Sequence, residues 1–224
     1  MNYHNRIIKK WTPVIIFIVG ILLLLAIKLF IRERIITNNI NFRLKSSAGT
    51  IELVINDSLI EAAATGKQPD KDRYSNMQKK IDRIASIHEV DYVYVVIENR
   101  DSVYFVICNI LPSDIINNIE IKYLDVFAEA PPELKEAFRM NDNIIFGKNS
   151  NKWGTFRSAY IPRKTKGGIN YLLCSDKFIR DINKELFRVL TEFLISFIYI
   201  ILISFPLIYL QVNAIGGKKF KQKP

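Results

Sequence analysis

The chain has 224 residues, enough for one medium-sized domain with accessory segments. Its apolar content of 49% is high for a soluble protein, and its net charge of +10 would suggest nucleic-acid binding if the charge were evenly spread. Most of this positive charge instead flanks two apolar blocks near the chain ends, which disfavours nucleic acid as a partner.

The two apolar blocks cover residues 13–31 and 193–212. Each is about 20 residues long, which is enough to cross a hydrocarbon core of about 30 Å as a helix. We therefore predict transmembrane helices over residues 12–32 and 189–212. The first block is too long for a signal peptide and no small-x-small cleavage site follows it closely, so we expect an uncleaved anchor.

Basic residues lie outside both predicted spans, in residues 1–11 and 213–224. The positive-inside rule places both of these termini in the cytoplasm. Residues 33–188 are then expected on the other side of the membrane, as an extracytoplasmic domain.

The first half of this domain changes from a helical to a strand period. Apolar residues recur every three or four positions over 35–64, which predicts a long helix continuing from the membrane, and again over 73–87, after a turn at 66–72. Strict alternation then predicts an antiparallel hairpin of residues 92–97 and 103–108.

The second half is predicted as an irregular insert, a short helix and more strands. Residues 110–131 are bounded by prolines, and residues 132–139 form a compact helix with proline in its first turn. Strands are expected at 144–146, at 155–161 between Trp153-Gly154 and the stop at Pro162, and at 169–175 after a turn at 164–168. Asp176 is expected to cap a helix that runs from Lys177 into the second membrane block. The fold class is therefore α+β, with an antiparallel sheet of about five strands and long helices on one face.

The two cysteines, Cys108 and Cys174, have no metal-binding spacing, and each falls in an apolar strand-like run. Buried free thiols are favoured, while an oxidising compartment would permit a disulfide if the two strands were neighbours.

An ordered set of motifs resembles the extracytoplasmic Cache sensor domain, a PAS-like domain of bacterial receptor kinases, diguanylate cyclases and chemoreceptors. The resemblance covers about residues 35–185. The motifs are Tyr92-Val-Tyr94, Tyr104-Phe105, Pro132-Glu-Leu-Lys-Glu-Ala-Phe138, Trp153-Gly-Thr155, Ser158-Ala-Tyr-Ile-Pro162, Gly168 and Asp176.

This resemblance implies a single-Cache arrangement, in which a five-stranded antiparallel sheet has the strand order 2-1-5-4-3. It also implies a ligand pocket on the sheet face away from the long N-terminal helix. In this order the first strand would separate Cys108 from Cys174 by about 9.5 Å, two strand spacings, which is too far for a disulfide.

Position by position, the resemblance implies seven candidate ligand-binding residues: Tyr94, Tyr104, Tyr123, Trp153, Ser158, Tyr160 and Asp176. Relatives often carry acids where this chain has Cys108 and Asn151, and these departures weaken the case for an amino-acid ligand. Tyrosine packing within the core is the alternative role for the aromatic residues.

The residues do not predict an enzyme, a metal site or a cofactor. The two histidines, His4 and His88, are scattered, and Ser158 with Asp176 has no histidine at a recognisable spacing. A phosphate-binding glycine loop is also lacking from the sequence.

We therefore expect a two-pass protein of the bacterial cytoplasmic membrane that senses a small molecule outside the cell. Its signal would pass through the transmembrane helices to a separate output partner, and the layout is compatible with a homodimer through the long helix and the membrane helices. The alternatives are a structural or assembly protein that binds no ligand, and a truncated receptor.

Overall fold

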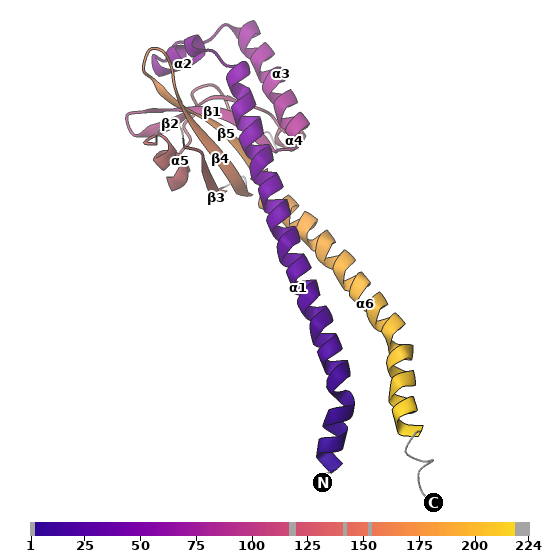
Figure 1. Cartoon of the computed structure of the whole chain (residues 1–224). Helices are drawn as coiled ribbons and strands as arrows, with labels where there is room; N and C mark the ends of the chain where they lie inside the picture. The colour runs from indigo at the N-terminus through magenta and orange to yellow at the C-terminus, as the bar shows by residue number, and fades with distance from the viewer. Residues whose placement is uncertain (1–2, 117–119, 141–142, 152–153, 218–224) are drawn as a thin grey trace, which may run out of the picture. The chain divides into compact units, whose positions relative to one another are not determined.

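A computed structural model of the chain describes residues 3–116, 120–140, 143–151 and 154–217. The chain divides into two compact units (Figure 1). One unit combines Met1–Ile36 with Lys184–Pro224, and the other is Thr37–Asn183.

The first unit consists of the outer parts of two long helices, α1 (Tyr3–Thr50) and α6 (Ile179–Gly217). The segments Ile15–Leu53 and Ile179–Pro206 are long and apolar enough to cross a membrane, and the most apolar stretch of each has no buried residues. Helices whose apolar side chains face outward in this way match the lipid-facing surface expected of membrane spans.

The second unit is built around one antiparallel sheet with the strand order β2-β1-β5-β4-β3. The strands are β1 (Tyr92–Asn99), β2 (Ser102–Cys108), β3 (Ile145–Asn151), β4 (Gly154–Lys164) and β5 (Asn170–Phe178). This order is the one that the Cache resemblance implies, and the predicted α+β fold class with a five-stranded sheet and a long N-terminal helix is confirmed.

Positive-φ residues shape the turns of the β1–β2 and β4–β5 hairpins. Arg100 and Asp101 both have positive φ, at 50° and 63°, as a two-residue type I′ turn between β1 and β2 requires. The β4–β5 turn closes with a hydrogen bond from the Gly168 amide to the Thr165 carbonyl, and Gly168 has a φ of 90° that favours glycine.

The helix predicted over residues 35–64 is interrupted. Helix α1 ends at Thr50, the 3₁₀ turn η1 (Ile51–Leu53) follows, and α2 (Asp57–Ala64) begins a new helix. The Asn56 side chain accepts a hydrogen bond from the Leu59 amide at 3.1 Å and so caps α2. The sequence Asn56-Asp-Ser was therefore a helix-start signal that the apolar spacing concealed. The helix predicted over 73–87 is confirmed as α3 (Lys71–His88).

Helix α1 packs on the sheet face formed by alternate residues of the central strands. Leu44 is fully buried, and Ser47 donates a hydrogen bond of 2.7 Å to the Ser175 hydroxyl of β5. Arg157 of β4 donates to Asn41 at 3.1 Å. Polar groups on this face therefore find partners on α1, which fixes the helix against β4 and β5. Figure 1 shows the domain end of α1 crossing the sheet, with α2 and α3 close to it.

The opposite face is covered by the segment between β2 and β3. It includes the short helices α4 (Pro112–Ile116) and α5 (Pro132–Ala137) and the buried residues Phe127, Leu134 and Phe138. Part of this segment pairs with β2, since the Phe127 amide donates to the Val103 carbonyl at 2.8 Å. The outer edge of β2 is therefore partly protected from other chains.

Strand β4 does not end at Pro162, as the sequence had predicted. It continues to Lys164 and still pairs with β5 there, whereas its pairing with β3 ends at Tyr160 opposite Ile145. Beyond Tyr160 one side of β4 has no neighbouring strand in the described sheet, so a residue without an N–H group is tolerated. The predicted strand at 144–146 is likewise longer, because β3 runs from Ile145 to Asn151.

Replacing Leu44 with alanine should lower the free energy of unfolding by about 2 to 5 kcal/mol, because the fully buried side chain would leave a cavity between α1 and the sheet. The midpoint of thermal unfolding of the full chain in detergent micelles measures this effect. The matched control is Leu53→Ala, since Leu53 is 86% exposed and its truncation should cost no more than about 0.5 kcal/mol. Equal midpoints for the two variants would contradict the packing of α1 on the sheet.

Candidate functional site

Four of the predicted ligand-binding residues lie together on the sheet face away from α1. Tyr94 is on β1, Ser158 and Tyr160 are on β4, and Asp176 is on the central strand β5. The register pairs Ser158 with Asp176 and places Cys174 of β5 between Tyr94 and Tyr160. Paired residues share a face of the sheet, so this arrangement follows from the register alone.

Asp176 is a strand residue, which corrects its predicted role as a helix cap. Strand β5 continues to Phe178, and Asp176 pairs with Tyr92 on one side and with Ser158 on the other. The Asp91 amide also donates to the Asp176 carbonyl at 2.9 Å. Backbone partners on both sides hold this residue in the sheet and direct its carboxyl group to the pocket face.

Asp176 is only 6% exposed. Burial raises its pKa to about 7, and the neighbouring hydroxyls of Ser158 and Tyr94 oppose this rise without cancelling it. At neutral pH the site therefore contains a carboxyl group that is close to half protonated.

By hydrogen-bond geometry, three buried polar atoms have no partner among the described residues: Oδ1 of Asp176, the Tyr94 hydroxyl and Oδ1 of Asn149. The Tyr94 hydroxyl is near enough to Asp176 to lower its pKa, but the two groups do not meet the geometric limits of a hydrogen bond. The amide nitrogen of Asn149 does have partners, because it donates to Ser158 Oγ at 3.0 Å and to the Tyr160 hydroxyl at 2.8 Å. Buried polar groups are normally paired, and each unpaired one costs about 1 to 3 kcal/mol. Three of them on one sheet face indicate a place where another molecule completes the hydrogen bonding.

Asn149 was missed by the sequence analysis. The predicted strand stopped at Phe146, three residues before it, because Gly147 and the polar residues that follow do not look like a buried strand. In the structure Asn149 pairs with Phe156 within β3, at the edge of the sheet. The available signal was the length of the next strand: a partner long enough to pair with all of Thr155–Tyr160 has to continue past Phe146 and include Asn149.

The charge of Asp176 acts on its neighbours. Burial is the main cause that raises the pKa of Tyr94, Tyr160, Cys108 and Cys174, and the negative charge of Asp176 is the second cause in all four. The tyrosines and thiols therefore remain neutral, and Asp176 is the one titrating group at the centre of this described cluster.

A hollow of about 20 Å³ adjoins these groups, which is room for about one water molecule. Aromatic rings form much of its wall, and Phe105 stacks on Phe127 with ring centroids 4.7 Å apart. The described lining residues are Tyr92, Tyr94, Phe105, Cys108, Ile121, Phe127, Asn151, Phe156 and Asp176. In this conformation the site is nearly closed.

Two other predicted site residues, Tyr104 and Tyr123, do not join this group. Tyr104 pairs with Ile97, so its side chain is on the opposite sheet face, and Phe105 occupies the pocket side instead. Tyr123 packs edge-on against Tyr74 of α3 and donates to the Lys67 carbonyl at 2.9 Å. Trp153 lies outside the described residues.

Cys108 and Cys174 are both free and buried. Each pairs with Tyr94, Cys108 from β2 and Cys174 from β5, so β1 separates them as the resemblance implies.

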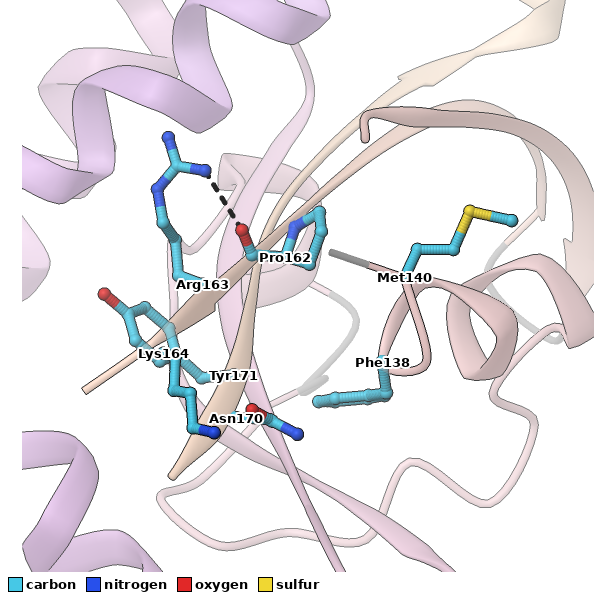
Figure 2. Close-up of a pocket in the computed structure, with 7 residues that line it drawn as sticks. All are labelled: Phe138, Met140, Pro162, Arg163, Lys164, Asn170 and Tyr171. Atoms are coloured by element: carbon cyan, nitrogen blue, oxygen red, sulfur yellow. Dashed lines mark hydrogen bonds between the residues drawn. The ribbon is translucent and has the colours of Figure 1, made fainter. Parts of the chain in front are cut away.

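A second, larger hollow of about 260 Å³ lies beside the end of the β4–β5 hairpin (Figure 2). Its lining residues are Phe138, Met140, Pro162, Arg163, Lys164, Asn170 and Tyr171. None of them was a predicted site residue and none lines the first hollow.

Within the described part of the chain, no group of three or more His, Cys, Asp or Glu residues could hold a metal ion. His88 ends α3, and its Nε2 lies 3.4 Å from the Thr50 hydroxyl. His88 therefore contacts the domain end of α1 rather than the hydroxyl and carboxyl groups around Asp176.

The pKa of Asp176 predicts a pH-dependent stability. An aspartate whose pKa is raised from 3.8 to about 7 destabilises the folded state increasingly as the pH rises between these values, since the folded protein then has to bind a proton or bury a charge. Asp176→Asn should therefore unfold at a higher temperature than the parent chain at pH 8. The gain should reach at most roughly 4 kcal/mol, shrink toward pH 4 and be constant above pH 8. Thermal unfolding of both proteins across this range measures the difference, and a difference that does not vary with pH would contradict the burial of an ionisable carboxyl group.

Comparison with known proteins gives only distant structural similarities. No protein-family model matches the chain, and no curated protein matches it. The sensor domain of Escherichia coli DcuS is 7% identical, with 66% of this chain and 97% of that chain covered and a TM-score of 0.41.

The sensory domain of the Campylobacter jejuni chemoreceptor Tlp3, with isoleucine bound, is 14% identical at a TM-score of 0.36, with 71% of this chain and 64% of that chain covered. The Tlp3 ligand-binding domain in complex with L-valine is 15% identical at a TM-score of 0.36, with 71% of this chain and 65% of that chain covered. The chain thus spans less than two thirds of these two Tlp3 domains. Its own strand order and the position of its long N-terminal helix are those of the PAS-like, single-Cache arrangement that the sequence resembles.

Proposed function

We propose that this chain is a membrane-anchored sensor that binds a small molecule at the sheet face formed by Tyr94, Ser158, Tyr160 and Asp176. The observation that carries the proposal is the set of three unpaired buried polar atoms on that face. The ligand would supply the hydrogen-bond partners that these three atoms lack. It would donate hydrogen bonds to Oδ1 of Asp176 and of Asn149 and accept one from the Tyr94 hydroxyl, as a small primary amide or a polyhydroxy compound can.

Binding would require the site to open, because the hollow holds about one water molecule in this conformation. The covering segment between β2 and β3 would have to move, since it contributes Ile121 and Phe127 to the hollow, and opening would break its backbone hydrogen bond from Phe127 to β2. A ligand then shifts the equilibrium toward the open state to the extent that it binds the open state more tightly than the closed one.

The signal would leave the domain through α1 and α6. Strand β5, which bears Asp176, leads directly into α6 at Ile179, and its Ser175 contacts α1 through Ser47 on the other face. A small displacement of β5 would therefore act on both helices that lead to the predicted membrane spans. We further propose that both termini are cytoplasmic, that a separate partner supplies the output, and that two copies associate through α1.

A second candidate is an interaction or assembly protein that binds no ligand. The small size of the hollow favours it, because aromatic rings already fill most of the pocket face.

The proposal is tested by ligand-dependent thermal stabilisation of the full chain in detergent micelles. The probes are panels of organic acids, amino acids, amines and purines. A ligand at about 100 times its Kd should stabilise the folded state by about 2.7 kcal/mol. No shift with any panel would favour the assembly role.

The site itself is tested by a matched pair of hydroxyl deletions. Tyr94→Phe should weaken the binding of a stabilising ligand roughly tenfold, because the variant lacks the buried hydroxyl that donates a hydrogen bond to the ligand. Tyr104→Phe is the control, since Tyr104 is on the neighbouring strand but on the opposite face. Equal losses in both variants would place the ligand elsewhere.

A further inference from the structure

The larger hollow near the β4–β5 turn is separate from the proposed sensor site. Its volume of about 260 Å³ is close to the lower end of the range for small-molecule pockets. The two hollows share no described lining residue, so a molecule could occupy this one without displacing anything from Asp176.

The last pairs of the β4–β5 hairpin build one side of it. Lys164 pairs with Asn170, and Arg163 pairs with Tyr171. Lys164 and Asn170 therefore share a sheet face, with side chains that start about 5 Å apart. The other side comes from the end of α5, where Phe138 and Met140 lie across the hollow from the hairpin (Figure 2).

The charge of the hollow is positive. Two of its lining residues are cations and none is an acid. Arg163 is already engaged, because its Nε lies 3.1 Å from Glu52 and its Nη1 donates to the Pro162 carbonyl at 3.0 Å. Lys164 forms no ion pair with any described residue. Its ammonium group is the charge available to a ligand.

The hollow also has apolar side chains in its wall, although polar groups make up more of the surface that it exposes. The Phe138 ring and the Pro162 ring are buried beside the hollow, and Met140 is 37% exposed at its mouth. Asn170 adds an amide that can donate or accept a hydrogen bond. A cation with an amide beside it and apolar side chains nearby matches a carboxylate attached to a compact, partly apolar body.

We propose that this hollow binds a small organic anion, with its carboxylate on Lys164 and Asn170 and its apolar body against Phe138, Pro162 and Met140. The site is independent of the sensor site in position and in chemistry, since that site presents a buried acid whereas this one presents a cation.

The chain provides its own reporter for a test. It contains three methionines, of which Met140 lines the hollow and Met77 is buried in α3. The experiment records methyl NMR spectra of the full chain, labelled with [¹³C-methyl]methionine and held in lipid nanodiscs, during titration with phenylacetate. A probe of this size should bind in the low millimolar range. The Met140 signal, assigned through Met140→Leu, should shift saturably and the Met77 signal should not.

Two comparisons test the role of charge. Lys164→Gln should weaken phenylacetate binding about threefold to tenfold, because an exposed ion pair is lost. A higher salt concentration should lower the affinity of the parent chain for phenylacetate by a similar factor. The neutral analogue phenylacetamide should bind the parent chain more weakly by a similar factor. The control is Lys80→Gln, which removes an exposed lysine from α3 and should leave the affinity unchanged.

Three outcomes would overturn the proposal. The first is a Met140 signal that does not move at up to roughly 20 mM phenylacetate. The second is an equal shift of Met77 and Met140, which would indicate a general effect of the additive. The third is the same affinity in the Lys164→Gln and Lys80→Gln variants.

Discussion

A carboxyl group buried in the middle of a sheet face sets the character of this domain. Asp176 is held there because β5 pairs on both sides at this residue, and burial raises its pKa to about 7. An unpaired buried charge is costly, so at neutral pH the group is only partly ionised unless a partner arrives. Its neighbours on β1 and β4 supply hydroxyls rather than cations, and the face is left ready for a hydrogen-bonding molecule.

The two faces of the sheet contrast in how their polar groups are satisfied. On the α1 side, Ser175 and Arg157 find partners on the helix. On the other side, Tyr94 and Asp176 keep polar atoms that no described residue pairs with. Hydrogen bonds to the sheet would let α1 follow a movement of the strands. A binding face instead needs polar groups that are free to form hydrogen bonds with a ligand. The same five strands provide both because side chains alternate between the faces.

Several features could be predicted from local residues. Alternating residues in Tyr92–Ile97 and Val103–Cys108 predicted the first hairpin, and the motif order predicted the strand order 2-1-5-4-3. Errors came where pairing overrides local signals. Pro162 does not end β4, because β3 has already stopped beside it, and Asp176 does not cap a helix, because two strands hold it extended. Tyr104 was assigned to the pocket from its motif. A register shift between Val95 and Val96 instead places Phe105 on the pocket face and Tyr104 on the opposite face.

By itself the sequence determined the periodic elements, the apolar ends and the class of fold, since these depend on hydrophobic spacing along the chain. It also placed Tyr94, Ser158, Tyr160 and Asp176 among the candidates. Only the tertiary structure decided that these four meet, that Asn149 joins them, and that Lys164 and Met140 face a second hollow. Strand register and the packing of the β2–β3 segment bring together residues that are far apart in the chain, and no local pattern records such contacts.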